Sequence, residues 1–167
     1  LVGGSHMVRR SVLTMFAVIA TAFAILSAMT LPGPASAITP SQTAVTSITV
    51  GSDPAGVAVS PDGSSVWVPN IISDTVSRIN TTTNIVTSIN VGDYPYSVAV
   101  SPDGSSVWVT NYGTGSGTTV SRIDTATNVV TSITVGSVPR NVAVGPCGSF
   151  VWVTNYGDNT VSRIDTA

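Results

Sequence analysis

Residues 57–79 read VAVSPDGSSVWVPNIISDTVSRI, and this stretch returns twice further along the chain. Residues 98–123 read VAVSPDGSSVWVTNYGTGSGTTVSRI, and residues 142–164 read VAVGPCGSFVWVTNYGDNTVSRI. The tryptophans of the three copies are 41 and then 44 residues apart, because a three-residue insertion lies between Asn111 and Val120. A fixed period near forty residues is typical of repeat architectures, in which each copy packs on the next.

Each copy contains four short strand patterns separated by turn patterns. In the first copy we expect strands at 56–60, 65–68, 75–79 and 85–91, and a Pro-Asp-Gly turn at 61–63. No part of this region shows the apolar spacing of a helix, which excludes a helical solenoid. Four short antiparallel strands per period of about forty residues predict one propeller blade. The predicted fold class is therefore all-β, a β-propeller made of four-stranded antiparallel blades.

Apolar side chains are expected on both faces of each predicted sheet. Successive residues of a strand point to opposite faces, so Val76 and Ile79 lie on different sides. This suits a blade covered on each side by a neighbour. The side chains repeated in every copy are expected to be structural, with the tryptophans packed between blades and the arginines hydrogen-bonded between blades. They are Trp67, Trp108, Trp152, Arg78, Arg122 and Arg163.

Several motifs together resemble the YVTN-type β-propeller repeat family. The sequence V-T-N occurs at 109–111 and 153–155, with tryptophan where the family's name has tyrosine, and V-A-V-S-P-D-G precedes it at 98–104. The resemblance covers residues 45–167, and it departs from the pattern at Pro69 and at 145–148. The family is similar to exported bacterial propellers, surface-layer proteins and lactonase-like propellers. The resemblance therefore implies a propeller fold and export, but it does not decide an activity.

The strand count predicts three blades with an offset N-terminal closing strand. Residues 45–50 are a spare copy of the fourth strand, whereas the third copy stops at Ala167 before its own fourth strand. Because propellers usually have about four to eight blades, two alternatives stay open. One is a partial ring belonging to a longer propeller. The other is half of a six-bladed homodimeric ring, in which each N-terminal strand completes the partner's last blade.

The N-terminal region has the layout of an export signal. Residues 1–7 are interpreted as a tag or an upstream extension, and residues 8–37 as a signal peptide, with paired arginines, an apolar run at 12–31 and the small residues A-S-A at 35–37. Residues 38–44 would be a short linker before the propeller segment 45–167. The expected location is secreted, periplasmic or cell-envelope associated. A membrane association is expected only if the signal stays uncleaved.

Composition excludes most catalytic chemistry. From residue 38 onward the chain has no Lys, Glu or His, so Ser-His-Asp, Cys-His and Schiff-base arrangements cannot form. We expect no catalytic residues, no metal site and no cofactor. The same region has four arginines against eight aspartates, so no nucleic-acid partner is expected. Cys147 replaces a turn aspartate and is interpreted as a surface thiol, or as the source of an intermolecular disulfide.

The residues that differ between copies are the candidate binding residues. They lie in loops that enter the innermost strand, or in loops that follow the second strand, and such loops line the mouth of a propeller. The candidates are Asp93, Tyr94, Tyr96, Arg140, Tyr112 and Tyr156. The leading hypothesis is an exported, non-catalytic scaffold that binds a protein, a peptide or a glycan. The alternatives are a lactonase-like or quinoprotein-like propeller enzyme, and a cell-wall or surface-layer structural element.

Overall fold

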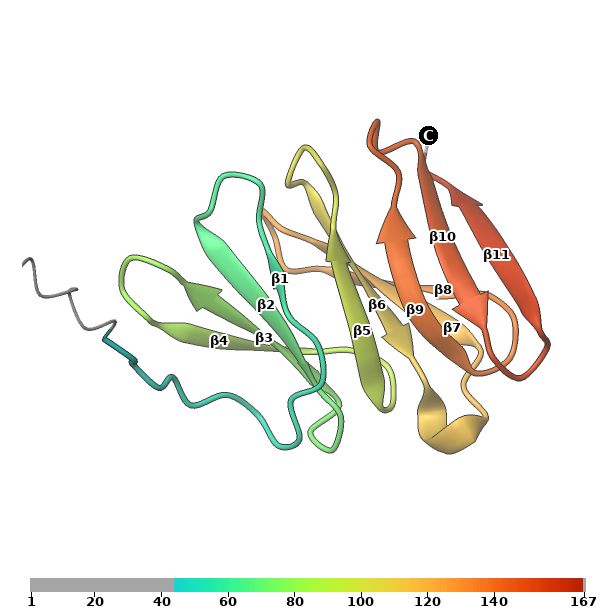
Figure 1. Ribbon diagram of the computed structural model, residues 1–167, viewed down its shortest axis with the longest axis horizontal. Coiled ribbons are helices and arrows are strands. Elements are labelled where there is room, and N and C mark those ends of the chain that lie inside the picture. The colour runs from blue at the N-terminus through green and yellow to red at the C-terminus, as the bar shows by residue number, and fades with distance from the viewer. Residues whose placement is uncertain (1–43, 167) are drawn as a thin grey trace, which may run out of the picture. The chain divides into compact units, whose positions relative to one another are not determined.

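A computed structural model describes residues 44–166 of the chain. The predicted extension at 1–7, the signal peptide at 8–37 and all but the last residue of the linker lie outside the described residues. The described part is built of strands, with one short 3-10 turn at Gly113–Gly115. It contains no helix long and apolar enough to cross a membrane. The strands form three antiparallel sheets that follow one another along the chain (Figure 1).

The three sheets are three propeller blades, which confirms the predicted fold class. Blade 1 contains β1 (Ala58–Val59), β2 (Ser65–Asn70), β3 (Thr75–Asn80) and β4 (Val86–Asn90). Blade 2 contains β5 (Pro95–Val100), β6 (Ser106–Asn111), β7 (Thr119–Asp124) and β8 (Val130–Thr134). Blade 3 contains β9 (Pro139–Val144), β10 (Phe150–Asn155) and β11 (Thr160–Asp165). In each blade the strands are paired in sequence order, from the inner strand outward.

A tight turn after each inner strand returns the chain into the second strand. Gly63, at the end of the Pro-Asp-Gly turn of blade 1, has φ of +71°, a conformation that favours glycine. The Asp62 carboxylate accepts hydrogen bonds from the hydroxyl of Ser60 (2.7 Å) and the N–H of Ser64 (3.0 Å). These hydrogen bonds lower the pKa of Asp62 from 3.8 to about 2. In blade 3, Cys147 takes the place of the aspartate and offers no carboxylate.

The blades share one register, so the repeated side chains take the same place in each. Trp67 is opposite Arg78 across β2 and β3, and Trp108 is opposite Arg122 across β6 and β7. Trp152 is likewise opposite an arginine across β10 and β11. A one-residue slip would turn each of these side chains to the other face of its sheet, so the common register requires the same packing at every blade boundary.

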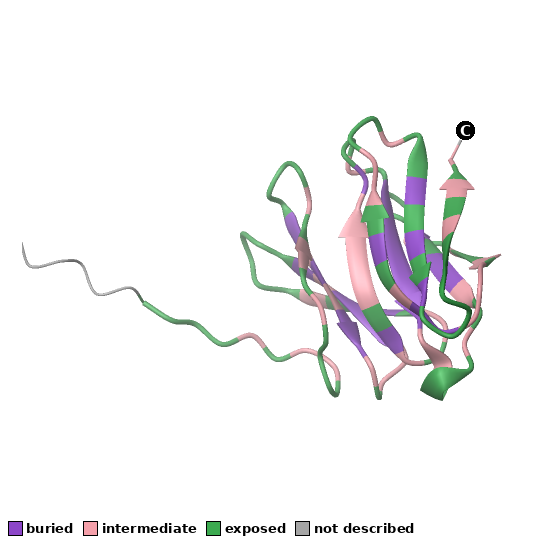
Figure 2. Ribbon diagram, turned by 45° about the vertical axis from the view of Figure 1, so that its right-hand side comes forward, coloured by how far each residue is buried: buried purple, intermediate pink, exposed green. Residues whose placement is uncertain are grey.

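The core lies between the blades, as the buried stripes in Figure 2 show. Trp67 and Val76 of blade 1 are fully buried against Val107, Val109 and other side chains of blade 2. Trp108 and Val120 of blade 2 are buried in the same way against blade 3, on Val142, Val151 and Val153. Burial of such side chains contributes about 1.5–3 kcal/mol each, so stacking between blades is the main source of stability.

The outermost place of blade 3 is unfilled in the described chain. Thr46–Val50, the spare copy of the fourth strand, forms no strand of its own and pairs with no sheet. Instead it leads into blade 1, where the backbone at Gly51 packs closely against the side chain of Asn70. Among residues 44–166 the offset strand therefore does not complete the third blade, and no described strand pairs with the outer edge of β11.

Candidate functional site

Four of the six candidate binding residues form one continuous row, here called the Tyr–Arg row. It consists of Tyr96, Tyr112, Arg140 and Tyr156. The rings of Tyr96 and Tyr112 have centroids 6.0 Å apart and are tilted by 37°. The Arg140 guanidinium carbon lies 5.6 Å from the Tyr112 centroid and 4.2 Å from the Tyr156 centroid. These are cation–π distances, so Arg140 joins a tyrosine of blade 2 to one of blade 3.

The Tyr–Arg row lies where each inner strand begins. In blade 3, Val138 has φ of +54° and Pro139 then begins β9, so the next residue, Arg140, follows a sharply turned backbone. Pro139 is paired with Asn155, the last residue of β10. The two strands run antiparallel, so Arg140 enters β9 where Tyr156 leaves β10, and the register shift next to the Pro139–Asn155 pair keeps Arg140 at this end of the blade. Blade 2 repeats the arrangement with Pro95 opposite Asn111, which brings Tyr96 and Tyr112 together in the same way.

The Arg140 guanidinium is held by the rings of two tyrosines. Among residues 44–166 its side chain donates no hydrogen bond, and its buried Nε has no partner. A buried donor without a partner costs about 1–3 kcal/mol. Because Nε is itself buried, the donors left for a ligand are the two terminal nitrogens of the guanidinium. Tyr96 and Tyr156 are 42% and 62% exposed, which leaves much of their phenol surface accessible. A stacked guanidinium between two phenols can bind a carboxylate or another planar anion at its edge.

Arg78 gives a clear contrast, since all of its contacts are internal. Its Nη1 donates to the carbonyl of Thr125 at 2.8 Å and to Asn128 at 3.2 Å, and its guanidinium lies 5.0 Å from the Trp67 ring centroid. It therefore links blade 1 to the outer turn of blade 2. The Arg78 side chain is hydrogen-bonded to the neighbouring blade, whereas the Arg140 side chain forms no hydrogen bond among residues 44–166.

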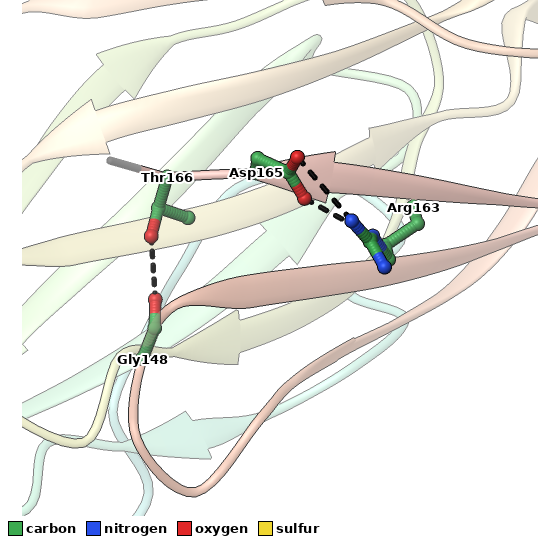
Figure 3. A network of polar contacts seen from close by, with 4 residues as sticks. All are labelled: Gly148, Arg163, Asp165 and Thr166. Atoms are coloured by element: carbon green, nitrogen blue, oxygen red, sulfur yellow. Dashed lines mark hydrogen bonds and ion pairs between the residues drawn. The ribbon is translucent and has the colours of Figure 1, made fainter.

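The other two repeated arginines each lie over an aromatic ring but form no hydrogen bond to another blade within residues 44–166. Arg122 lies over the Trp108 ring at 5.6 Å. Arg163 forms an exposed ion pair with Asp165 at 3.0 Å (Figure 3). Its guanidinium also lies over the Phe150 ring, 4.5 Å from the centroid. An exposed ion pair contributes about 0–1 kcal/mol, so it fixes a local geometry and little more. Trp152, the third tryptophan, is 46% exposed, unlike its two counterparts.

The structure places the remaining two candidates, Asp93 and Tyr94, in the turn before β5. The backbone N–H of Tyr94 donates to the Asp74 carboxylate at 2.8 Å, and its φ is +51°. The carbonyl of Asp93 accepts a hydrogen bond from the N–H of Gly113 at 3.1 Å. Both residues therefore shape the loop, and neither takes part in the aromatic and cation–π contacts found among residues 44–166.

Blade 1 does not continue the row. At the places of Tyr96 and Tyr112 it has Ala55 and Ile71. The sequence identified the members of the row as separate loop residues but missed that they touch. The signal that could have found the contact is the shared spacing, because each candidate pair directly follows the paired Pro and Asn of its blade.

Hollows elsewhere in the described structure are shallow and polar. One of them, of about 560 Å³, lies at the opposite end of blades 2 and 3, beside their Asp103 and Cys147 turns and Arg122. Residues 44–166 contain no group of three or more His, Cys, Asp or Glu side chains placed to hold a metal ion. The Tyr–Arg row is accordingly the strongest candidate site in the described part of the chain.

Comparison with known proteins defines the fold class. No protein-family model and no curated protein matches the chain. Hydrazine synthase of Kuenenia stuttgartiensis is similar, with 28% identity and a TM-score of 0.64 over 73% of this chain and 35% of that one. A 6-phosphogluconolactonase-like protein of Bacteroides uniformis has 18% identity and a TM-score of 0.59, over 72% of this chain and 38% of the other.

A functionally unknown protein of Desulfotomaculum acetoxidans is also similar, with 19% identity and a TM-score of 0.57, over 72% of this chain and 44% of that one. The chain thus spans between about a third and a half of the length of these solved structures. The similarity supports a propeller-like fold of antiparallel sheets.

Proposed function

We propose that this protein is an exported, non-catalytic β-propeller of the YVTN type that binds a protein, a peptide or a glycan through the Tyr–Arg row. The observation that carries the proposal is the position of Arg140. It is stacked between two tyrosines from different blades, and its guanidinium has no acceptor among the described residues. A cation in this setting favours a ligand that offers a carboxylate, because a planar anion can take two parallel N–H donors.

The distribution of differences between the blades supports the same proposal. Scaffold positions such as Trp67 and Trp108 are identical, whereas Ala55, Tyr96 and Arg140 differ at one equivalent place. Variation at a single exposed place on a repeated frame is what a binding surface requires, because neighbouring blades can then present different chemistry. Export follows from the signal-like segment at 8–37 and from the YVTN resemblance.

A lactonase-like or quinoprotein-like enzyme is the alternative, and a surface-layer element is a second. Two neighbours have lactonase-like descriptions, at 18% and 21% identity. The absence of His, Glu and Lys after residue 37 supports the non-catalytic proposal. Hydrolysis of 6-phosphogluconolactone by the purified protein, lost on substitution of the row, would favour the enzyme instead. Sedimentation with the cell envelope would favour the surface-layer element.

The binding proposal is tested by titration calorimetry with two acidic polymers. Poly-L-glutamate represents an acidic peptide and polygalacturonate an acidic glycan, with dextran as the uncharged control. We expect Arg140→Gln to weaken binding of the preferred polymer by at least about tenfold, since a charged hydrogen bond contributes about 1.5–3 kcal/mol. The matched control is Arg122→Gln, which removes an exposed arginine outside the row and away from both ends of the stack. Equal affinity of all three proteins would contradict a role for the row.

A further inference from the structure

Both blade boundaries within the chain use the same pair of faces. The leading face of a blade presents a tryptophan and a valine, Trp67 with Val76 in blade 1 and Trp108 with Val120 in blade 2. All four are between 0% and 2% exposed. The trailing face of the next blade receives them with aliphatic side chains, including Val109 in blade 2. The described chain therefore contains the same blade-to-blade interface twice.

The same two faces also occur uncovered, one at each end of the stack. Trp152 and Val161 form the leading face of blade 3 and are 46% and 57% exposed. Val57 and Val59 belong to the trailing face of blade 1 and are 68% and 57% exposed. Large apolar side chains gathered on an exposed sheet face mark an interaction surface. Because the two faces are complementary wherever they meet inside the chain, each is suited to the other.

The segment before blade 1 and the outer edge of blade 3 are also complementary. The glycine after each outer strand packs against the asparagine of the next blade, as Gly92 does on Asn111. Gly51 makes this contact with Asn70, so Thr46–Val50 stands where the outer strand of a preceding blade would stand. At the other end of the stack, no strand of the described part of the chain pairs with the outer edge of β11. An unpaired strand edge is a ready template for an added strand.

We propose that two copies of this chain assemble head to tail into a closed six-bladed ring. The leading face of blade 3 in each copy packs on the trailing face of blade 1 in the other. The segment Thr46–Thr49 of each copy becomes the fourth strand of the partner's blade 3. Six blades lie within the usual range of about four to eight, and exchange of an identical element is a low-cost route to a dimer.

The register of the exchanged strand follows from blade 2. There Thr119 pairs with Thr134 and Arg122 with Thr131. By equivalence of the repeats, Thr160 pairs with the partner's Thr49, and Arg163 pairs with the partner's Thr46. The same assembly brings the partner's Ala55 beside Tyr156, where its small side chain leaves the outer ring face open.

The first test is the molar mass of the purified full chain by light scattering. We expect twice the mass of a single chain, which is 17.0 kDa before any signal peptide is removed. Trp152→Asp should lose the dimer and give the single-chain mass with an unchanged far-ultraviolet spectrum. The control is Ile85→Asp, at a residue that is 65% exposed in a turn away from both end faces, and it should remain dimeric. A wild-type monomer, an open polymer, or a dimer that survives Trp152→Asp would overturn the proposal.

The second test is disulfide trapping in a Cys147→Ser background. A chain with Thr46→Cys is refolded together with a chain carrying Arg163→Cys and then oxidised, and a covalent dimer is expected on a non-reducing gel. The pair Thr49→Cys and Thr160→Cys should behave alike. The mismatched pair Thr46→Cys and Thr160→Cys is about 10 Å out of register, so it should not link. A link that forms only within one chain carrying both cysteines would refute exchange.

Discussion

Replacing equivalent tryptophans by alanine should have unequal effects, because only their neighbours differ. Trp67 is fully buried between blades 1 and 2, whereas Trp152 is 46% exposed on the end face of blade 3. Truncating a buried tryptophan costs about 3–5 kcal/mol, which includes the cavity that is left. The indole N–H of Trp67 has no hydrogen-bond partner among the described residues. Because the alanine variant no longer buries this unpaired donor, the expected loss of stability is at the lower end of that range, about 3 kcal/mol.

For Trp152→Ala the expected cost is about 1–2 kcal/mol. Roughly half of the side chain already contacts water, and truncation at an open face leaves no cavity. The assay is urea unfolding followed by far-ultraviolet circular dichroism, at a protein concentration low enough for single chains. With a slope of about 1–2 kcal/mol per molar urea, the two midpoints should differ by about 1 M. Equal midpoints for the two variants would refute the argument that blade-to-blade burial determines stability.

Three further changes probe the turns and the close contacts between blades. The hydrogen bond from the Ser101 hydroxyl, and after it that from the N–H of Ser105, lowers the pKa of Asp103 to about 2. The stabilising effect of the Asp103 carboxylate is therefore present above about pH 4 and is lost as the pH falls toward 2. The melting temperature of Asp103→Asn should therefore fall less between pH 5 and pH 2 than that of the wild type, and parallel curves would contradict this. In Gly92→Ala the new Cβ would lie 2.5 Å from the Asn111 amide carbon, so we expect a loss of at least about 1 kcal/mol in urea unfolding, with an unchanged midpoint as the contrary result. Cys147→Asp restores the turn carboxylate and should raise the melting temperature by a few degrees, while a lower melting temperature would show that the third turn has a different geometry.

The repeat in the sequence was enough to predict the fold. Strand positions follow from alternation between Gly, Pro and Asp turns, and the period of about forty residues separates a propeller from a sandwich. The innermost strand of blade 1 is shorter than expected, only Ala58–Val59, because no blade within residues 44–166 covers the trailing face on which Val57 and Val59 are exposed. Tertiary neighbours determine how far such an edge strand extends.

The site could be predicted only in part. The sequence identifies Tyr96, Tyr112, Arg140 and Tyr156 as variable loop residues, but their assembly into one row depends on how blades 2 and 3 stack. Likewise, the same sequence motif gives Arg78 hydrogen-bond acceptors in the next blade and leaves Arg163 in an exposed ion pair. The difference comes from the presence or absence of a following blade, which no local pattern contains.

The uniform boundary between blades has a consequence for how such proteins change size. Since Trp67 and Trp108 make the same contact with different partners, a whole repeat can be inserted or removed without inventing any new interface. Ring size is then a matter of how many copies the gene carries, rather than of side-chain chemistry. Unequal recombination between near-identical repeats would produce such variants directly. Each added repeat would bring a packed core and one more copy of the variable position that Ala55, Tyr96 and Arg140 occupy.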